Sequence, residues 1–110
     1  MRKYRNKKTT VDGLLFDSLR EAARWQELQL LERAGHIRGL QRQVSYELAP
    51  SVKFEGAKRA QPPLRLIVDF AYTEKDRRVL EDTKGFVTPV FTAKRHILKH
   101  LTGLDVRVTK

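Results

Sequence analysis

Leu64–Tyr72 (LRLIVDFAY) and, after a short polar segment, Arg78–Lys84 (RVLEDTK) decide the fold of this chain. The first stretch is apolar at almost every position, which is typical of a central strand that is covered on both faces. The polar residues 74–77 (EKDR) favour a turn, and Gly85 stops the second strand. We therefore expect two antiparallel strands in the middle of a sheet.

The segments on either side alternate between helical and extended patterns. A helix is expected over 18–34, and residues 43–49 alternate as a half-buried strand. A second helix runs from Pro89 to about residue 101, and residues 104–108 alternate as a last strand. The resulting α-β-β-β-α-β order predicts a single α/β domain with a mixed β-sheet flanked by helices. A polar excursion over 50–63 is expected to carry a short strand around 52–54.

The inner faces of the two helices follow from a period of 3.6 residues per turn. In the first helix the broad apolar face comprises Leu19, Ala22, Ala23, Gln26, Leu30 and Ala34. A neighbouring stripe on the same helix comprises Glu21, Trp25, Leu28 and Glu32. In the second helix the inner stripe comprises Val90, Phe91, Lys94, Ile97, Leu98 and Leu101.

The formal net charge of +10 is concentrated at the two ends of the sequence. Residues 1–8 hold five basic residues and no acid, residues 84–110 hold six basic residues and one acid, and the middle is neutral. A polyanion is the natural partner, because each Lys or Arg near a phosphate releases a counterion. The alternative is a solubilising tail. We expect DNA to contact a flexible basic arm, residues 1–8, and one face of the second helix, through Arg2, Lys3, Arg5, Lys7, Lys8, Arg95, His96, Lys99 and His100.

The composition excludes several classes of protein. The sequence has no cysteine, which excludes a disulfide framework, a thiolate zinc site and a cysteine nucleophile. No apolar run approaches the roughly 20 residues of a membrane span, and no apolar stretch follows the basic start as in a secretory signal. The expected location is therefore the cytoplasm, with no membrane partner.

Ionisable residues stand out where the predicted strands should be buried. Asp69 interrupts the apolar stretch, where a carboxylate is costly unless it is paired or bound to a metal ion. Asp82 and Lys84 point to the same side of the next strand, whereas Glu81 points the other way unless a bulge reverses them. Two carboxylates and a backbone carbonyl make a hard oxygen site suited to Mg²⁺. The alternative is structural, with a buried ion pair at Asp69 and a salt bridge between Asp82 and Lys84.

The arrangement resembles the PD-(D/E)XK nuclease superfamily. Asp69 matches the acid on that family's second strand, and Asp82-Thr83-Lys84 matches the D/E-x-K tripeptide on its third strand. Glu21 matches an acid that many members carry on the first helix, while Val68 stands where the motif often has proline. The chain is also similar to small phage and prophage endonucleases and, in layout, to phage Holliday-junction resolvases, through Tyr4–Thr9, Val11–Gly13, Phe16–Ala22 and Glu81–Pro89.

The resemblance implies a restriction-endonuclease-like nuclease domain over residues 9–110 that hydrolyses phosphodiester bonds in DNA, with branched or recombining DNA as the expected substrate. Glu21, Asp69 and Asp82 would bind Mg²⁺, which Mn²⁺ can replace, with the Thr83 carbonyl as a further ligand. Lys84 would position the attacking water or stabilise charge on the phosphate. A junction substrate would imply a homodimer, because two cuts need two sites. The location would be a bacterial or phage-infected cell. The alternative function is a non-catalytic nucleic-acid-binding module of the same fold.

Two further features lie on the second helix. Lys94 falls on the inner stripe, where a lysine either snorkels to the rim or points at an active site. We expect it to reach the scissile phosphate and count it among the catalytic residues. His96 and His100 have the i, i+4 spacing of a metal pair, but no third ligand lies nearby in sequence, which favours a surface that faces phosphates.

Overall fold

The computed structural model of the chain describes residues 8–110. In it, β4 (Leu64–Glu74) and β5 (Arg77–Thr83) form the antiparallel pair that the sequence predicts. Lys75 and Asp76 connect the two strands with φ angles of 48° and 62°, as a two-residue hairpin turn requires. The hairpin register sets Phe70 opposite Glu81, which fixes how the acids of the two strands face one another.

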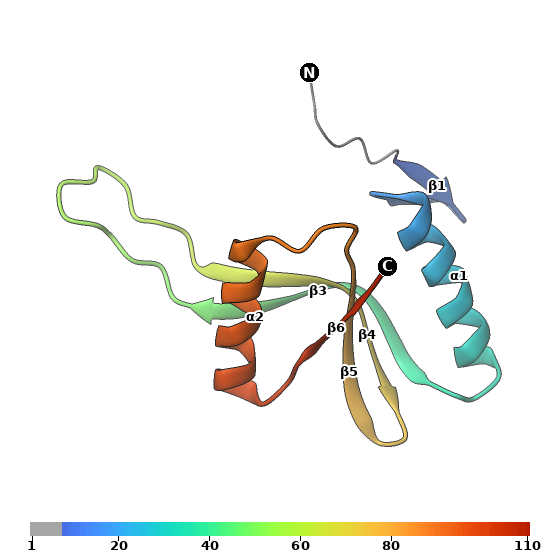
Figure 1. Ribbon diagram of the computed structural model, residues 1–110. Coiled ribbons are helices and arrows are strands. Elements are labelled where there is room, and N and C mark those ends of the chain that lie inside the picture. The colour runs from blue at the N-terminus through green and yellow to red at the C-terminus, as the bar shows by residue number, and fades with distance from the viewer. Residues whose placement is uncertain (1–7) are drawn as a thin grey trace.

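Two further strands extend this pair into a sheet of mixed direction (Figure 1). β3 (Arg38–Ala49) pairs antiparallel with β4, and β6 (Val106–Thr109) pairs parallel with β5, in the order β3-β4-β5-β6. β3 begins five residues before the predicted strand, and its backbone is irregular at Gly39 and Gln43, which have φ angles of 67° and 50°. The predicted small α/β domain with a mixed sheet is confirmed.

Two helices pack on this sheet, and local signals set their ends. α1 (Leu19–Arg33) begins after Ser18, whose Oγ accepts a hydrogen bond from Glu21 N at 3.1 Å, as in the predicted cap. α2 (Pro89–Thr102) begins with proline and ends at Gly103, which takes a left-handed φ of 78°.

A small hairpin precedes α1. It is formed by β1 (Thr9–Val11) and β2 (Leu14–Phe16) around the predicted Asp12-Gly13 turn. Phe16 at its end is fully buried against α1. The predicted flexible basic arm, residues 1–8, lies outside the described residues except for Lys8, which is exposed.

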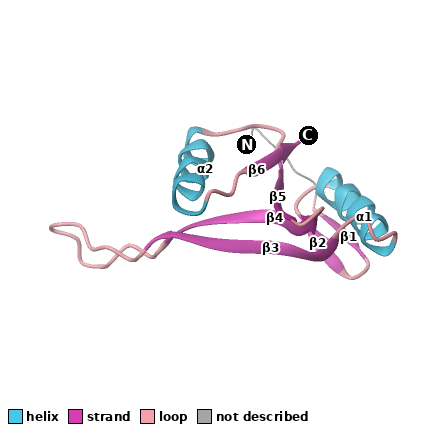
Figure 2. Cartoon of the chain, turned by 90° about the horizontal axis from the view of Figure 1, so that it is seen from below, coloured by secondary structure: helices cyan, strands magenta, loops and turns pink. Residues whose placement is uncertain are grey.

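β4 contacts both helices because it passes between two parts of the core. Leu66 and Val68 pack in a cluster with Leu98 of α2, whereas Phe70 packs in a second cluster with Leu28 of α1. Figures 1 and 2 show the two helices standing apart, with β5 and β6 between them. Asp69 therefore lies at the point where β4 passes from the α2 cluster to the α1 cluster.

The buried side of α1 is not the side that carries most of its apolar residues. Leu19 and Leu30, on the predicted broad face, are 63% and 61% exposed, whereas Glu21 on the neighbouring stripe is buried. Trp25, one turn further along that stripe, stacks on Phe70 of β4 with ring centroids 6.0 Å apart. The stripe of Glu21 and Trp25 thus packs on the sheet together with Ala22 of the broad face, because Glu21 and Trp25 have partners on β3 and β4.

The inner stripe of α2 is narrower than predicted. Phe91 and Leu98 are buried, as expected, but Val90 and Leu101 are mostly exposed. Residues seven apart therefore carry the contact of this helix with the sheet, which is the spacing of two helical turns.

Residues 50–63 leave the sheet as a long extension between β3 and β4 (Figures 1 and 2). The strand predicted at 52–54 is absent, since Val52 and Gln61 form one isolated bridge. Proline at positions 50, 62 and 63 cannot donate to a ladder, which explains why pairing of the two strands stops at Ala49 and Leu64.

A buried ion pair ties α1 to β5. Both carboxylate oxygens of the fully buried Glu81 contact the guanidinium of Arg24. Tyr72 OH donates a further hydrogen bond to Glu81 Oε2 at 2.6 Å, and burial together with this acid raises the pKa of Tyr72 to about 12. Glu81 is therefore fully occupied in joining the first helix to the sheet.

We predict that Arg24→Ala lowers the free energy of unfolding by about 3–5 kcal/mol, because it leaves the Glu81 carboxylate buried without its cation. Urea denaturation followed by circular dichroism measures the loss. The matched control is Arg33→Ala, an exposed arginine at the end of the same helix, which should change stability by less than about 0.5 kcal/mol. Equal stabilities for the two variants would contradict this role of Arg24.

Candidate active site

Asp69 and Asp82 face each other across β4 and β5 and exchange hydrogen bonds with the opposite backbone. Asp69 N donates to Asp82 Oδ1 at 3.0 Å, and Thr83 N donates to Asp69 Oδ2 at 2.7 Å. These bonds continue the strand pairing past Phe70 and Glu81, the last paired residues on this side of the hairpin. The side-chain bonds hold the two carboxylates in place at the point where the two strands separate.

Glu21 approaches this pair from the first turn of α1. Its side chain is buried, and its Oε2 lies 3.7 Å from Nη2 of Arg42 on β3. The Arg42 guanidinium also lies over the ring of Phe16, 4.1 Å from its centroid. The cap of α1 therefore points Glu21 at the sheet, and Arg42 supplies the opposite charge.

A pocket of about 420 Å³ brings most of the predicted site together. It is lined by Asp17, Ser18, Glu21, Asp69, Thr83, Lys84, Gly85 and Phe86. Asp82 lies behind this lining, where it is buried and paired with Lys84. Residues from α1, from both central strands and from the loop before α2 thus meet around one hollow.

Lys84 is held at the pocket from two directions. Its backbone N–H donates to Thr109 O of β6 at 2.9 Å, which continues the parallel pairing of β5 and β6. Its Nζ lies 3.1 Å from Asp82 Oδ2 and 4.6 Å from the centroid of the Phe91 ring. The Lys84 side chain is one-third exposed and lines the pocket, so it can reach a ligand there while it keeps its partners.

The electrostatics of the site favour partial protonation of its acids. Burial raises the pKa of Asp69 from 3.8 to about 6, and the nearby Glu21 carboxylate adds to the effect. Burial and the charge of Asp69 raise the pKa of Asp82 from 3.8 to about 6, against the opposing effect of Lys84. Burial also raises the pKa of Glu21. Negative charge is thus crowded here beyond what the protein's own cations neutralise.

The donor set fits a hard divalent cation in its chemistry. Carboxylate and carbonyl oxygens are the ligands that Mg²⁺ takes in proteins. Asp82 Oδ2 is buried and receives no well-aligned hydrogen bond, although Lys84 lies beside it. As they are placed, no three or more His, Cys, Asp or Glu side chains among residues 8–110 form a group that could hold a metal ion. Glu21, Asp69 and Asp82 therefore provide suitable oxygens without forming a closed cage.

Glu81 lies outside this pocket. The register of β4 and β5 shows no bulge, so neighbouring residues of β5 point to opposite sides, with Glu81 toward Arg24 and Asp82 toward Lys84. This geometry settles which acid of the Glu81-Asp82 pair can serve the pocket, and it is Asp82.

Lys94 is not brought to this pocket. It is half-buried on α2 and lines a separate hollow of about 600 Å³ with residues of the 50–63 extension, among them Pro50, Val52 and Phe54. Helical periodicity grouped Lys94 with Phe91 and Leu98, but it did not show which part of the sheet this stripe would cover.

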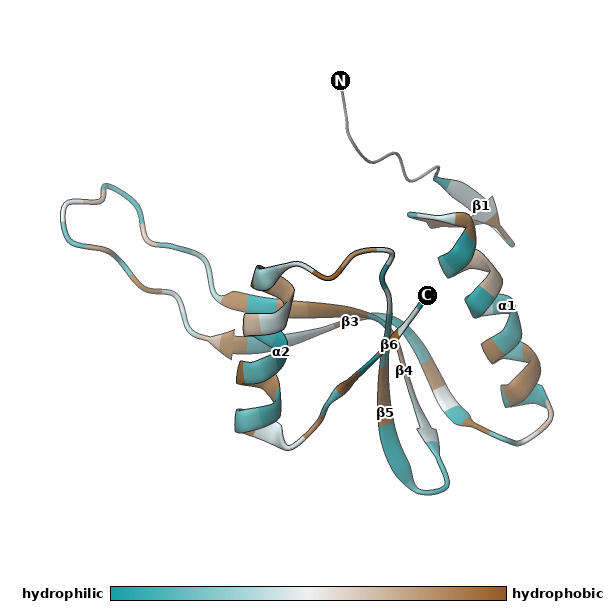
Figure 3. Ribbon diagram, in the orientation of Figure 1, coloured by the Kyte–Doolittle hydropathy of each residue, from teal (hydrophilic) through white to brown (hydrophobic). Residues whose placement is uncertain are grey.

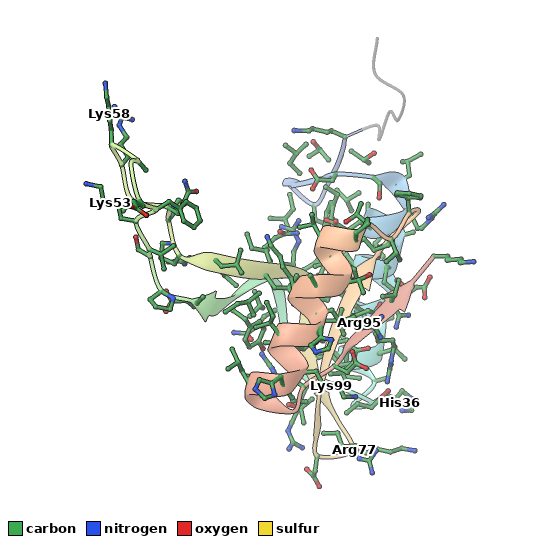
Figure 4. All side chains as sticks on the ribbon, turned by 60° about the vertical axis from the view of Figure 1, so that its left-hand side comes forward. His36, Lys53, Lys58, Arg77, Arg95 and Lys99 are labelled. Atoms are coloured by element: carbon green, nitrogen blue, oxygen red, sulfur yellow. The ribbon has the colours of Figure 1, made fainter. Side chains whose placement is uncertain are left out.

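The predicted DNA-contacting residues of α2 lie on its outer side. Arg95 Nε and Lys99 Nζ both bind the carboxylate of Asp105, at 2.8 and 3.5 Å (Figure 4). His96 and His100 are exposed. Asp105 thus pairs with two of the residues that were predicted to contact DNA phosphates. The predicted DNA-contacting residues of the basic arm, Arg2, Lys3, Arg5 and Lys7, lie outside the described part of the chain.

Arg42 is the site residue that sequence reasoning missed. It pairs with Phe70 in the register of β3 and β4, so it lies one residue pair away from Asp69. The predicted strand began at residue 43, but continuing its alternation of Val44, Tyr46 and Leu48 backwards by two residues would have placed Arg42 on the same side. An arginine at such a position indicates a buried acid nearby.

Comparison with known proteins places the chain in a family. The family described as "Protein of unknown function (DUF1064)" matches residues 1–109, and the chain belongs to it. No curated protein and no solved structure matches the chain. Within the described residues, no helix is both long and apolar enough to cross a membrane.

The raised pKa of Asp69 predicts a pH-dependent stability. An acid whose pKa is higher in the folded state than in the unfolded state binds protons more tightly when folded. The wild type should therefore lose stability relative to Asp69→Asn as pH rises from about 4 to about 6, and the difference should stay constant above that range. Urea denaturation in EDTA across this pH range measures the difference.

The matched control for this titration is Asp12→Asn, on the exposed turn of the first hairpin, where a positive φ suits asparagine. This variant should follow the wild type at every pH. An unchanged difference between the wild type and Asp69→Asn over the same interval would show that the folded carboxyl has an ordinary pKa, and a gain of stability by the wild type would show a lowered pKa.

Proposed function

We propose that the chain is a metal-dependent DNA endonuclease of the PD-(D/E)XK kind. The observation that carries the proposal is the pairing of Asp69 with Asp82 across two strands, with Lys84 beside Asp82 and Glu21 entering the same pocket. These are the acid, the D/E-x-K tripeptide and the helix acid of the superfamily motif. Residues from three separate segments of the sequence thus come together in the combination that this chemistry needs.

The architecture supports the same proposal. The chain runs through α1, three antiparallel strands, α2 and a last strand that joins the sheet parallel to β5. This layout is compatible with a restriction-endonuclease-like core, in which the motif acids lie on the second and third strands. Asp69 and Asp82 lie on the second and third strands of this sheet.

The side chains that would hold Mg²⁺ or Mn²⁺ are Glu21, Asp69 and Asp82, with the Thr83 carbonyl. When bound, the ion supplies Lewis-acid polarisation of a phosphate and lowers the pKa of a water. The chain's own contribution is an anionic pocket whose acids repel one another and whose Lys84 adds one positive charge. That ammonium can hold a phosphate oxygen and stabilise the charge that develops on it during hydrolysis.

The second candidate function is a non-catalytic nucleic-acid-binding module, which another observation favours. Each acid of the pocket already has a partner in the protein: Glu21 has Arg42, Asp69 has the Thr83 N–H, and Asp82 has Lys84. Because the protein itself satisfies these three acids, the pocket can have a purely structural role, which is to join α1 to the sheet. Metal-dependent cleavage separates the two candidates.

The substrate of the nuclease is proposed to be branched or recombining DNA. Two cuts in a junction need two active sites, so this substrate implies that the protein acts as a homodimer. A panel of junction, flap, single-stranded and duplex DNA, incubated with Mg²⁺, Mn²⁺ or EDTA, tests the activity and its preference. Cleavage in either metal and none in EDTA is the expected result, and binding without cleavage on every substrate would favour the non-catalytic module.

Lys84→Ala should lower the single-turnover cleavage rate at saturating enzyme by about 10²-fold or more, because it removes a charge placed at the reacting phosphate. Its control is Lys99→Ala, which breaks another lysine–aspartate pair that lies outside the pocket. Saturation removes the binding contribution, so Lys99→Ala should cleave at the wild-type rate. Equal rates for Lys84→Ala and the wild type would remove Lys84 from the mechanism.

Asp69→Asn should weaken Mn²⁺ binding at least about tenfold, because the site loses a charged oxygen ligand. Isothermal titration calorimetry measures the affinity directly and needs no DNA. Asp12→Asn should bind Mn²⁺ like the wild type. Unchanged affinity in Asp69→Asn would argue that any bound ion is held elsewhere.

A further inference from the structure

The 50–63 extension is an exposed, cationic hairpin that projects from the sheet. It leaves the sheet after Ala49 and returns at Leu64, and its turn includes Gly56 with a φ of 80° and a bond from Ala57 N to Phe54 O at 3.1 Å. Seven residues on each side at about 3.3 Å per residue give a reach of roughly 20 Å. Figures 1 and 2 show the extension pointing away from both helices and the rest of the sheet.

Three basic residues of the extension stand apart from the ion pairs of the molecule. Lys53, Lys58 and Arg59 are exposed, and none of them has an ion-pair partner within residues 8–110. Glu55 is the one acid of the extension. Figure 4 shows Lys53 and Lys58 reaching outward at one extreme of the molecule, far from Arg77 at the tip of the β4–β5 turn. The extension thus presents uncompensated positive charge at its free end.

Apolar side chains accompany these cations. Val52 and Phe54 are 48% and 62% exposed, and Figure 3 shows hydrophobic segments in the extension, well away from the core. At the base of the extension, Val52 and Phe54 line the hollow of about 600 Å³ together with Lys94 and the exposed Ile67. Positive charge with interspersed apolar groups suits a nucleic acid, which offers phosphates together with sugar and base surfaces.

We propose that the 50–63 extension is a DNA-contacting element, which enters a groove of duplex DNA and binds its phosphates through Lys53, Lys58 and Arg59. The proposal rests on the proposed function for its choice of ligand. The major groove, which is about 12 Å wide, admits a pair of adjacent extended segments, and the extension consists of two such segments joined by the bridge between Val52 and Gln61. Lys94 and Arg65 line the hollow at the base of the extension and add positive charge there.

Charge favours DNA over a second copy of the chain as the occupant. Two extensions that pack together would bring their unpaired cations close to one another with two glutamates between them. Phosphates neutralise those cations, and each contact releases about 0.9 counterion from duplex DNA. Self-association is therefore treated as the competing outcome of the test.

The test compares two triple variants in an Asp69→Asn background, in which the DNA stays uncut. Lys53/Lys58/Arg59→Ala removes the cations of the extension, and Arg33/Lys75/Arg77→Ala removes three exposed cations that also lack ion pairs within residues 8–110. Fluorescence anisotropy with a labelled 30-base-pair duplex in EDTA gives Kd across a KCl series. The extension variant should lower the slope of log K against log [KCl] by about 2–3, from three lost phosphate contacts. The control variant should keep the slope of its parent.

The outcomes separate this inference from the proposed function. Equal slopes for both triple variants, with the parent binding DNA, would overturn the role of the extension and leave the nuclease proposal intact. A parent that binds no DNA in any salt would overturn both. A change of sedimentation coefficient in the extension variant with an unchanged slope would assign the extension to contact between copies. Unchanged melting temperatures of the variants show that their fold is retained.

Discussion

The exchange of hydrogen bonds between Asp69 and the Asp82-Thr83 segment is the interaction on which the rest of the structure depends. It replaces backbone pairing with side-chain pairing where β4 passes from the α2 cluster to the α1 cluster. The strands can separate there without leaving buried N–H groups unpaired. The separation opens a pocket, and the same two acids line or support it. Asp69 and Asp82 therefore both hold the two strands together and supply carboxylates at the pocket.

Positive charge from the protein makes this crowding of acids tolerable. Arg42 neutralises Glu21, Lys84 neutralises Asp82, and Arg24 neutralises Glu81 on the opposite side of β5. The three pairs differ in exposure. The Glu81 pair is closed by Tyr72 and joins the helix to the sheet, whereas the Lys84 pair opens into the pocket. Neighbouring acids of one strand therefore have different roles, because alternation turns one toward α1 and the other toward the solvent-filled hollow.

The sequence predicted the central hairpin from short-range patterns, and it predicted part of the pocket, including Glu21, Asp69 and Lys84 but not Arg42, while Lys94 lies elsewhere. Alternation along β5 separated Asp82 from Glu81, and the cap at Ser18 placed Glu21 in the first turn of α1. The orientation of α1 could not be predicted, since it depends on the contacts of Trp25 with Phe70 and of Glu21 with Arg42. The environment of Lys94 depends on the direction of the 50–63 extension. Its three prolines indicate that strand pairing stops there, but they do not determine where the extension points.

The parallel pairing of β6 with β5 constrains the order in which the pocket can form while the chain is being synthesised. The backbone N–H of Lys84 donates its hydrogen bond to Thr109 O, about 25 residues later in the chain, whereas its ammonium group pairs with Asp82, two residues earlier. At 5–20 residues per second, a growing chain carries its acids for roughly 1–5 s before the backbone of the lysine can be fixed beside them. The β4–β5 hairpin can form earlier from local contacts alone. A nascent chain could therefore form the Lys84–Asp82 pair before β6 is made, and the backbone of Lys84 would be fixed only when the last strand joins the sheet.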